Sequence, residues 1–349
     1  MKKIEFGLMT FADMSPEPNP GKGTNAHQRI QHLLEEIKLA DKLGVDVFGI
    51  GEHHRDDYAV SSPATVLAAA AAVTQQIKLT SAVTVLSSDD PVRIYQQFAT
   101  VDAISGGRAE IMAGRGSFIE SFPLFGYDLN DYDELFEEKL ALLLQINKAE
   151  KVTWSGNLRA PLHQAGIYPR AVDGELPIWL AAGGTPASAL RAAKLNLPLM
   201  LAIIGGVPRQ FVPFINLYKN SALEAGIPAE KLQIGINNHL FIGEDGDKVA
   251  DDFFPYYAQM MDRVGRSRGW QPMSRAQFDY MRSAEGSLMV GSVAQVVEKI
   301  VYEHKLFGFT RFFAQASMSF VPHELTMKSI ELFATQVIPE VKKRLAISS

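Results

Sequence analysis

The sequence predicts an α/β fold with the element count of a (β/α)8 TIM barrel. Eight short runs of apolar and β-branched residues alternate with longer amphipathic segments, and nearly every run is followed by such a segment. The runs are almost continuously apolar, which is typical of parallel strands covered on both faces. Because periodicity alone cannot show that a sheet closes, a doubly wound open sheet is the alternative.

The elements can be placed in order along the chain. We expect strands at Ile4–Thr10, Asp46–Ile50, Lys78–Val85, Ala109–Ala113, Pro177–Ala181, Pro198–Ile204, Gln233–Ile242 and Arg311–Ala316. We expect helices at Asn25–Leu43, Ser62–Thr74, Pro91–Ile104, Asp133–Asn147, Thr185–Lys194, Pro208–Ala225, Ser292–Lys305 and Pro322–Leu345. Three local signals support these boundaries. Asp90 and Thr185 each precede a proline at a first helical position, and Gly44 suits the residue that follows a helix.

Two segments exceed what a barrel needs, so we expect one domain over residues 1–349 with two insertions. Residues 151–172 read as an inserted hairpin or loop before the fifth strand. Residues 245–291 contain an acidic amphipathic helix and then the polar, glycine-rich stretch GRSRGWQPMSRAQFDYMRSAEG. Since this second insertion follows the seventh strand, it should project from the carboxyl-end face of the barrel as a lid.

Composition excludes several classes of protein. Of the 349 residues 47% are hydrophobic, which supports a large core, while the net charge of −5 and the lack of a basic block argue against nucleic acid or an anionic membrane as partner. The absence of cysteine rules out disulfides, thiolate metal sites and cysteine nucleophiles. No signal-peptide pattern and no membrane-length apolar run is visible, so we expect a soluble, cytoplasmic protein.

The triplet Glu52-His53-His54 follows the second predicted strand, where barrel enzymes gather catalytic groups. If the strand continued, the adjacent histidines would point in opposite directions, whereas Glu52 and His54 could share a face. No second His/Asp cluster with ligand spacing occurs, so we expect no metal. We expect one histidine to pack at the rim and the other to be a functional imidazole that moves a proton.

Two further motifs suit an anion. Gly183-Gly184-Thr185 lies between a strand and a helix, and the N–H groups at such a helix start can bind phosphate. A plain β-to-α turn is an equal alternative for this motif. Arg115, flanked by glycines at the end of the fourth strand, could reach the barrel mouth and pair with phosphate, the alternative being a surface ion pair. No Walker A or G-x-S-x-G motif occurs, and GIGEHH departs from the dinucleotide fingerprint.

These pieces together resemble the bacterial luciferase-like family of flavin-dependent monooxygenases. The likeness runs over nearly the whole chain and rests on GEHH, on SAVTVLSSDDPVRIYQQFATVDAISGGRAEIMAGRGSF and on PIWLAAGGTPASALRAAKLNLPLML. It implies a (β/α)8 barrel, usually a homodimer, that binds reduced FMN at its carboxyl-end mouth. It also implies a cis peptide between Ala82 and Val83 beneath the flavin ring.

The resemblance assigns roles to the motifs. His53 matches the catalytic histidine, with His54 second and Glu52 in support, and the phosphate-contacting positions are Arg115, Gly183, Gly184 and Thr185. The implied reaction uses reduced FMN and O2 to oxidise a small organic substrate through a flavin C4a-(hydro)peroxide, with a separate reductase supplying the flavin.

This chain also departs from the family. Gly114 replaces a reactive cysteine of the luciferases, and Asp133 stands in the region of a second phosphate-binding arginine, which argues against luminescence. Three alternatives stay open: a deazaflavin-dependent hydride-transfer enzyme, a non-catalytic flavin-binding protein, and a metal-dependent hydrolase.

Overall fold

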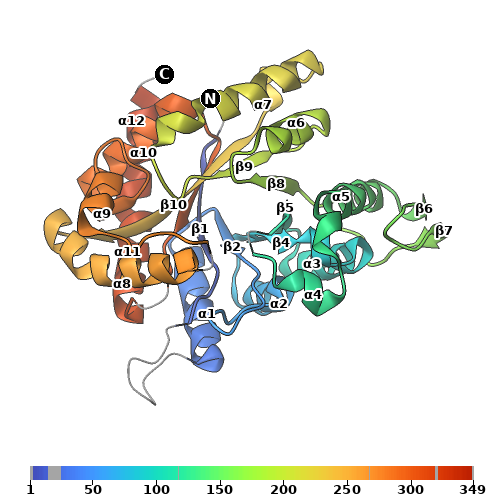
Figure 1. Ribbon diagram of the computed structural model, residues 1–349, viewed down its shortest axis with the longest axis horizontal. Coiled ribbons are helices and arrows are strands. Elements are labelled where there is room, and N and C mark those ends of the chain that lie inside the picture. Colours follow the sequence, from blue (N-terminus) through green and yellow to red (C-terminus); the bar gives the residue numbers. More distant parts are fainter. Residues whose placement is uncertain (1–2, 15–24, 117, 267, 319–320, 348–349) are drawn as a thin grey trace.

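The computed structural model describes residues 3–14, 25–116, 118–266, 268–318 and 321–347, and its centre is a closed parallel barrel (Figure 1). Its strands are β1 (Glu5–Thr10), β2 (Val47–Ile50), β3 (Lys78–Ser81), β5 (Ala109–Gly114), β8 (Ile178–Ala182), β9 (Leu199–Ala202), β10 (Ile234–Gly243) and β12 (Arg311–Gln315). Each pairs in parallel with its neighbours in this order, and β12 pairs with both β10 and β1. This last pairing closes the sheet, which confirms the barrel and excludes the open doubly wound alternative.

Helices surround the barrel on its outside (Figure 1). They are α1 (Ala26–Lys42), α2 (Pro63–Val73), α3 (Pro91–Ser105), α5 (Tyr132–Lys148), α6 (Pro186–Lys194), α7 (Val212–Glu224), α10 (Val293–Phe307), α11 (His323–Leu332) and α12 (Ile338–Ile347), with a π-helical turn over Phe333–Val337. The Asp90 carboxylate caps α3 by accepting from the backbone N–H of Val92 at 2.9 Å. Gly44, with φ of +77°, follows α1. The Thr185 hydroxyl pairs instead with the Ser188 hydroxyl at 2.8 Å.

The structure is more finely divided than the sequence predicts. The cis peptide between Ala82 and Val83 that the resemblance implies is present, and it interrupts the expected third strand after Ser81; the strand resumes as β4 (Thr84–Val85), which pairs with β5. An unpredicted strand, β11 (Met289–Ser292), pairs with the outer half of β10. Short helical elements fill other loops: α4 (Ser121–Phe125) and 3-10 turns over Leu86–Ser88, Leu129–Asp131, Pro208–Phe211 and Ala229–Lys231.

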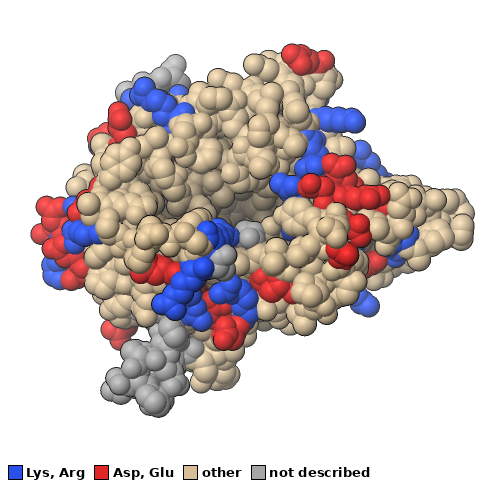
Figure 2. Space-filling model, viewed as in Figure 1, with Lys and Arg blue, Asp and Glu red and all other residues tan. Residues whose placement is uncertain are grey.

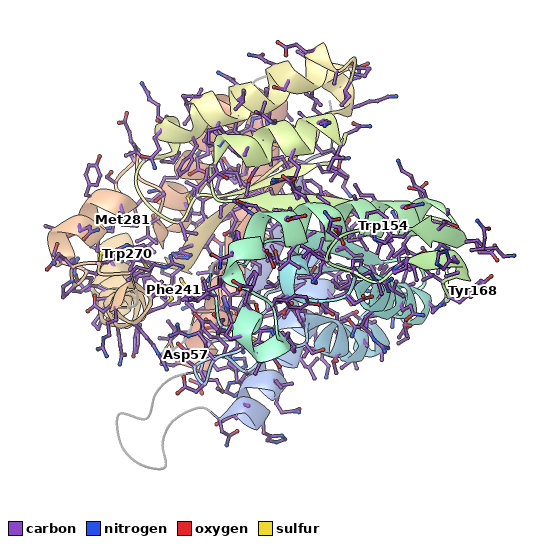
Figure 3. The ribbon with its side chains drawn as sticks, turned by 45° about the vertical axis from the view of Figure 1, so that its right-hand side comes forward. Asp57, Trp154, Tyr168, Phe241, Trp270 and Met281 are labelled. Carbon is purple, nitrogen blue, oxygen red and sulfur yellow. The ribbon has the colours of Figure 1, made fainter. Side chains whose placement is uncertain are left out.

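The two predicted insertions lie on opposite sides of the molecule. Residues 151–172 contain an antiparallel hairpin of β6 (Lys151–Trp154) and β7 (Leu162–Gly166), which projects at the right of Figure 1. Residues 245–291 contain α8 (Gly246–Arg266) and α9 (Arg275–Arg282) at the left. In Figure 3, Trp270 and Met281 mark the α8–α9 side and Tyr168 marks the hairpin side. The second insertion therefore stands at the end of β10.

Strand alternation sorts the side chains into two layers. Phe6, Leu8 and Phe48 are fully or almost fully buried in the main core, which lies between the barrel and its helices. Residues of the other parity, such as Met9 and Phe313, fill the barrel interior. None of the described helices combines the length and the hydropathy that crossing a membrane requires.

A buried ion-pair cluster closes the amino end of the barrel. The Arg311 guanidinium donates to Glu110 at 2.6 and 3.0 Å and to Glu5 at 2.9 and 2.5 Å, and it lies 4.2 Å from the centre of the Trp179 ring. Lys78 also pairs with Glu5, at 2.7 Å. Burial alone would raise the pKa of Glu5, but Arg311 and Lys78 hold this pKa below its usual value. Four strands are thus joined through charged side chains.

Candidate active site

A cavity of about 850 Å³ opens at the carboxyl end of the barrel. Its walls come from the last residues of the barrel strands, from the loops that follow them, and from α8, α9 and the segment between these helices. Figure 2 shows the hollow in this face, with basic side chains at its edge. A pocket at this end of a (β/α)8 barrel is where enzymes with this fold carry out their chemistry.

His53 faces this cavity from the loop after β2. Its side chain is 6% exposed and packs among the rings of Phe11, Tyr58 and Phe118, whose centres lie 4.3 to 4.8 Å away. The Nδ1 atom lies 3.4 Å from a carboxylate oxygen of Glu120. Burial alone would raise the pKa of Glu120, but hydrogen bonds from His53 and nearby backbone N–H groups lower it. His53 is therefore a fixed imidazole with a carboxylate partner at one ring nitrogen.

Glu52 and His54 form a second pair. The Glu52 carboxylate lines the cavity, accepts from His54 Nε2 at 2.8 Å and accepts from the backbone N–H of Val85 at 3.0 Å. His54 is not a lining residue, and its ring packs edge-on against Phe125. The hydrogen bond to Glu52 raises the pKa of His54, although burial opposes this rise. Because β2 ends at Ile50, strand alternation does not apply to this triplet: Glu52 and His53 both line the cavity, and His54 lies behind Glu52 as its hydrogen-bond partner.

The cis peptide between Ala82 and Val83 lies in the cavity wall, and both residues contribute to the lining. Two glycines support it at close range. A Cβ atom at Gly114 would lie 2.7 Å from Val83 Cγ2, and one at Gly49 would lie 2.8 Å from Ala82 Cβ. No side chain fits at either position without a shift of the peptide. This contact gives a physical reason why residue 114 is glycine in this chain.

Arg115 and the start of α6 form the polar edge of the cavity. The Arg115 guanidinium donates to Asp133 at 2.6 Å and to the Thr185 hydroxyl at 3.4 Å, and it lies 5.3 Å from the centre of the Tyr132 ring. Gly183 also lines the cavity, and a Cβ atom there would contact nothing within 4 Å. Gly184 lies outside the lining and has φ of +104°. Arg115 therefore forms the ion pair of one alternative while also facing the cavity, and its contact with phosphate stays a prediction.

The opposite wall holds site residues that the sequence analysis missed. Asn237 and His239 alternate on β10, and the strand register places His239 beside Gln315 of β12. All three line the cavity, together with methionines of α8 and α9. The signal was available, because polar residues at alternate positions of an otherwise apolar strand indicate a polar spot inside the barrel. Glu120 carried no such signal, since it lies in the loop before α4 and meets the His53 side chain only through tertiary folding.

Among the described residues, no group of three or more histidine, aspartate or glutamate side chains is arranged to hold a metal ion. The comparisons with known proteins give the family. Residues 4–310 match the family model described as luciferase-like monooxygenase. The chain belongs to the luciferase-like monooxygenase family.

Relatives agree with this membership. A luciferase-like monooxygenase of Escherichia coli is 27% identical over 277 residues, covering 77% of this chain and 76% of the relative. The crystal structure of monooxygenase RslO1 from Streptomyces bottropensis superposes with a TM-score of 0.81 at 26% identity, covering 96% of this chain and 99% of that one.

Two more distant structures share the fold and differ in cofactor. The oxygenating constituent of 3,6-diketocamphane monooxygenase from Pseudomonas putida, solved in complex with FMN, gives a TM-score of 0.77 at 19% identity, with 98% of this chain and 99% of that one covered. A coenzyme F420-dependent tetrahydromethanopterin reductase from Methanopyrus kandleri gives 0.73 at 21%, with 97% and 99% covered.

Proposed function

We propose that this chain is an FMN-dependent monooxygenase that uses reduced flavin and O2 to oxidise a small organic substrate. One observation carries the proposal: a single cavity joins an edge that carries the Arg115 guanidinium to an imidazole–carboxylate pair at His53 and Glu120, with the Ala82–Val83 peptide in the wall. Membership of a monooxygenase family supports the same reaction class.

The residues at the polar edge suit the phosphate of FMN. Arg115 offers a guanidinium that can bind two phosphate oxygens, and the N-terminus of α6 adds a favourable dipole. Gly183 leaves this edge open, because no side chain fills the space beside it. Asp133 neutralises part of the Arg115 charge, so phosphate would compete with it for the guanidinium. Gly184 and Thr185 would hold the turn that directs the helix at the phosphate.

His53 would hold and move the proton of the reaction. Bound reduced FMN would supply the electrons that activate O2. With Nδ1 turned to Glu120, the Nε2 atom of His53 is the nitrogen left to accept a proton from, or return it to, a group in the cavity. Glu120 would stabilise the charged imidazolium that results. Glu52, tied to His54 and Val85, would keep this loop in place, and α8 and α9 would close over the cavity to exclude water.

The phosphate assignment is tested by Arg115→Ala. Loss of a charge-assisted contact should weaken FMN binding about 10- to 100-fold and change riboflavin binding by less than about threefold, since riboflavin has no phosphate. Quenching of flavin fluorescence measures both affinities. Arg191→Ala, which removes an arginine of α6 paired with Glu137, is the matched control and should leave both unchanged. Equal losses for FMN and riboflavin would overturn the assignment.

A deazaflavin enzyme is the second candidate, because the F420-dependent structure shares the fold over nearly the whole chain. Comparing the affinities for FMN and F420 in the same preparation separates the two. Oxygen uptake after mixing with chemically reduced FMN then separates an enzyme from a flavin carrier. A separate flavin reductase and a homodimeric assembly also belong to the proposal, and a coupled assay and light scattering test them.

A further inference from the structure

The cavity has a second half that the proposed flavin site does not use. It is formed by β10 and β12 at the floor and by α8, α9 and the segment between them at the side. In Figure 3, Trp270 and Met281 lie together in this part of the molecule. Because the Arg115 edge lies at β5 and α6, this second half is where a substrate would be bound if FMN occupies the first.

Methionines dominate the walls of this half. Met260, Met261, Met273 and Met281 come from α8, α9 and the segment between these helices, while Met9, Met112 and Met200, on β1, β5 and β9 of the barrel interior, lie at the floor of the cavity as a whole. Methionine is flexible and polarizable, so a wall of methionines adapts to the outline of a large apolar body. Phe313 and Trp270 add flat surfaces to the same walls. Such a wall suits a bulky apolar substrate.

Three uncharged polar side chains interrupt this apolar surface. His239 Nδ1 lies 3.1 Å from the Tyr257 hydroxyl, and the ring also hydrogen-bonds Gln315. Burial lowers the pKa of His239 to about 4, so its imidazole is neutral at physiological pH. The Asn237 amide donates to the Phe313 carbonyl at 3.3 Å, which uses one of the hydrogen bonds an amide can make. The three side chains form a small polar patch on one face.

Charge is almost absent from this half. The described residues of β10, β12, α8 and α9 that line the cavity include no lysine, arginine, aspartate or glutamate. Arg268, between α8 and α9, stands at the mouth, with its guanidinium 4.9 Å from the Phe118 ring centre and 5.2 Å from that of Trp270. An anionic substrate would therefore lose its hydration without gaining a cation at the floor.

We propose that the substrate of this site is a bulky, uncharged, largely apolar molecule with one carbonyl or hydroxyl group, and that the amides of Asn237 and Gln315 bind that group while His239 holds Gln315 in position. This inference rests on the proposed function, since it takes the other half of the cavity as the flavin site. The polar patch would fix the orientation of the substrate, while the methionine walls would accept its apolar body.

Equilibrium dialysis with matched probes tests the proposal. Acetylnaphthalene, ethylnaphthalene and naphthoate share one apolar body and carry a ketone, a hydrocarbon and a carboxylate at the same ring carbon, and cyclohexanone is a small ketone. The ketone should bind at least about 5-fold tighter than ethylnaphthalene, as one hydrogen bond allows, and at least about 10-fold tighter than naphthoate and cyclohexanone. Dialysis is done with the flavin-free protein and again with saturating oxidised FMN.

Substitutions in the polar patch test whether the ketone oxygen of the probe binds there. Asn237→Leu and His239→Phe keep the approximate shapes and should reduce the preference for ketone over hydrocarbon to about twofold or less. Retained binding of ethylnaphthalene shows that each variant is folded. Gln145→Leu removes an exposed amide of α5, outside the cavity, and should leave the preference unchanged.

The proposal is overturned if naphthoate or cyclohexanone binds as tightly as acetylnaphthalene. An equal preference for ketone over hydrocarbon in the wild type and in both folded variants also overturns it. FMN affinity, measured separately by fluorescence quenching, tests the proposed function on its own. If the protein does not bind FMN, the proposed function fails, but the affinities of the flavin-free protein for the four probes still test the substrate class.

Discussion

The two ends of the barrel are built on opposite principles. At the amino end, the buried pair of Arg311 and Glu110 joins the partly exposed Glu5 and Lys78 in one cluster of charges. At the carboxyl end, the interior is a cavity of about 850 Å³ with methionine walls and neutral polar groups. The layer of Met9, Met112, Trp179, Met200 and Phe313 separates them. The amino end is filled and is stabilised by ion pairs, whereas the carboxyl end is open and can bind a ligand.

This difference indicates that the amino end of the barrel contributes mainly to stability and the carboxyl end mainly to function. A buried ion pair that loses one partner leaves an uncompensated charge, so the closed end should be sensitive in stability. The open end surrounds a cavity, so we expect substitutions of its lining residues to act mainly on activity.

The largest expected effect is on stability at the closed end. Arg311→Met removes the cation and leaves the buried Glu110 and the partly buried Glu5 without their main partner. We expect a loss of about 3–5 kcal/mol in the free energy of unfolding, measured by urea denaturation. Arg344→Met, which breaks ion pairs on the surface of α12, is the control and should leave the urea midpoint unchanged. Equal shifts in the two variants would contradict the role of the buried cluster.

The next effect is on activity at the open end. His53→Ala should lower turnover by about 10²- to 10⁴-fold, because it removes the group that moves the proton, and should change the flavin dissociation constant by less than about threefold. Single-turnover product formation with an identified substrate measures turnover, and flavin fluorescence measures the dissociation constant. The urea midpoint should fall less than in Arg311→Met, because loss of the buried ring leaves a cavity but no buried, unpaired charge. His163→Ala, on the exposed hairpin, is the control and should have normal turnover. Normal turnover in His53→Ala would contradict the role of His53 in moving the proton.

The smallest effect is at the rim, where pH controls the pair of His54 and Glu52. The hydrogen bond to Glu52 raises the pKa of His54 in the folded protein. The pair of His54 and Glu52 therefore stabilises the folded protein fully at pH values below the pKa of histidine in the unfolded chain, which is about 6.5. This contribution is lost as pH rises through the folded pKa.

The difference in urea midpoint between wild type and His54→Gln should therefore shrink from about pH 5.5 to about pH 8.5. His27→Gln, which removes an exposed histidine of α1, controls for the loss of an imidazole as such. A difference that grows with pH would show that the stabilising form is the neutral one.

The strands and helices could be predicted because their signals are local. Asp90 before a proline and Gly44 after a helix mark boundaries through backbone geometry alone, and the alternation of Phe6 and Leu8 with interior residues follows from strand parity. The division of the third strand at Ala82–Val83 has no local signal. It depends on how Gly49 and Gly114 approach that peptide in space.

The candidate site was predictable only in part, for the same reason. His53 and Glu52 could be found because strand ends in a barrel meet at one rim. Which of the two histidines faces the cavity depends on the path of the loop after β2. The Glu52 carboxylate holds this loop by accepting a hydrogen bond from the backbone N–H of Val85, which is more than 30 positions away in the sequence. Glu120 and the polar patch on β10 and β12 arise only when distant segments pack together.

The pairing of β1 with β12 also determines when the barrel can form during translation. The ion pair between Arg311 and Glu5 joins residues 306 positions apart, and the same two strands pair along their length. On the ribosome, β1 emerges long before its partner and has an unpaired edge until β12 is made. Contacts of such long sequence separation are slow to form, because loop-closure entropy opposes them. The yield of native protein should therefore depend on chaperones that cover this edge in the nascent chain.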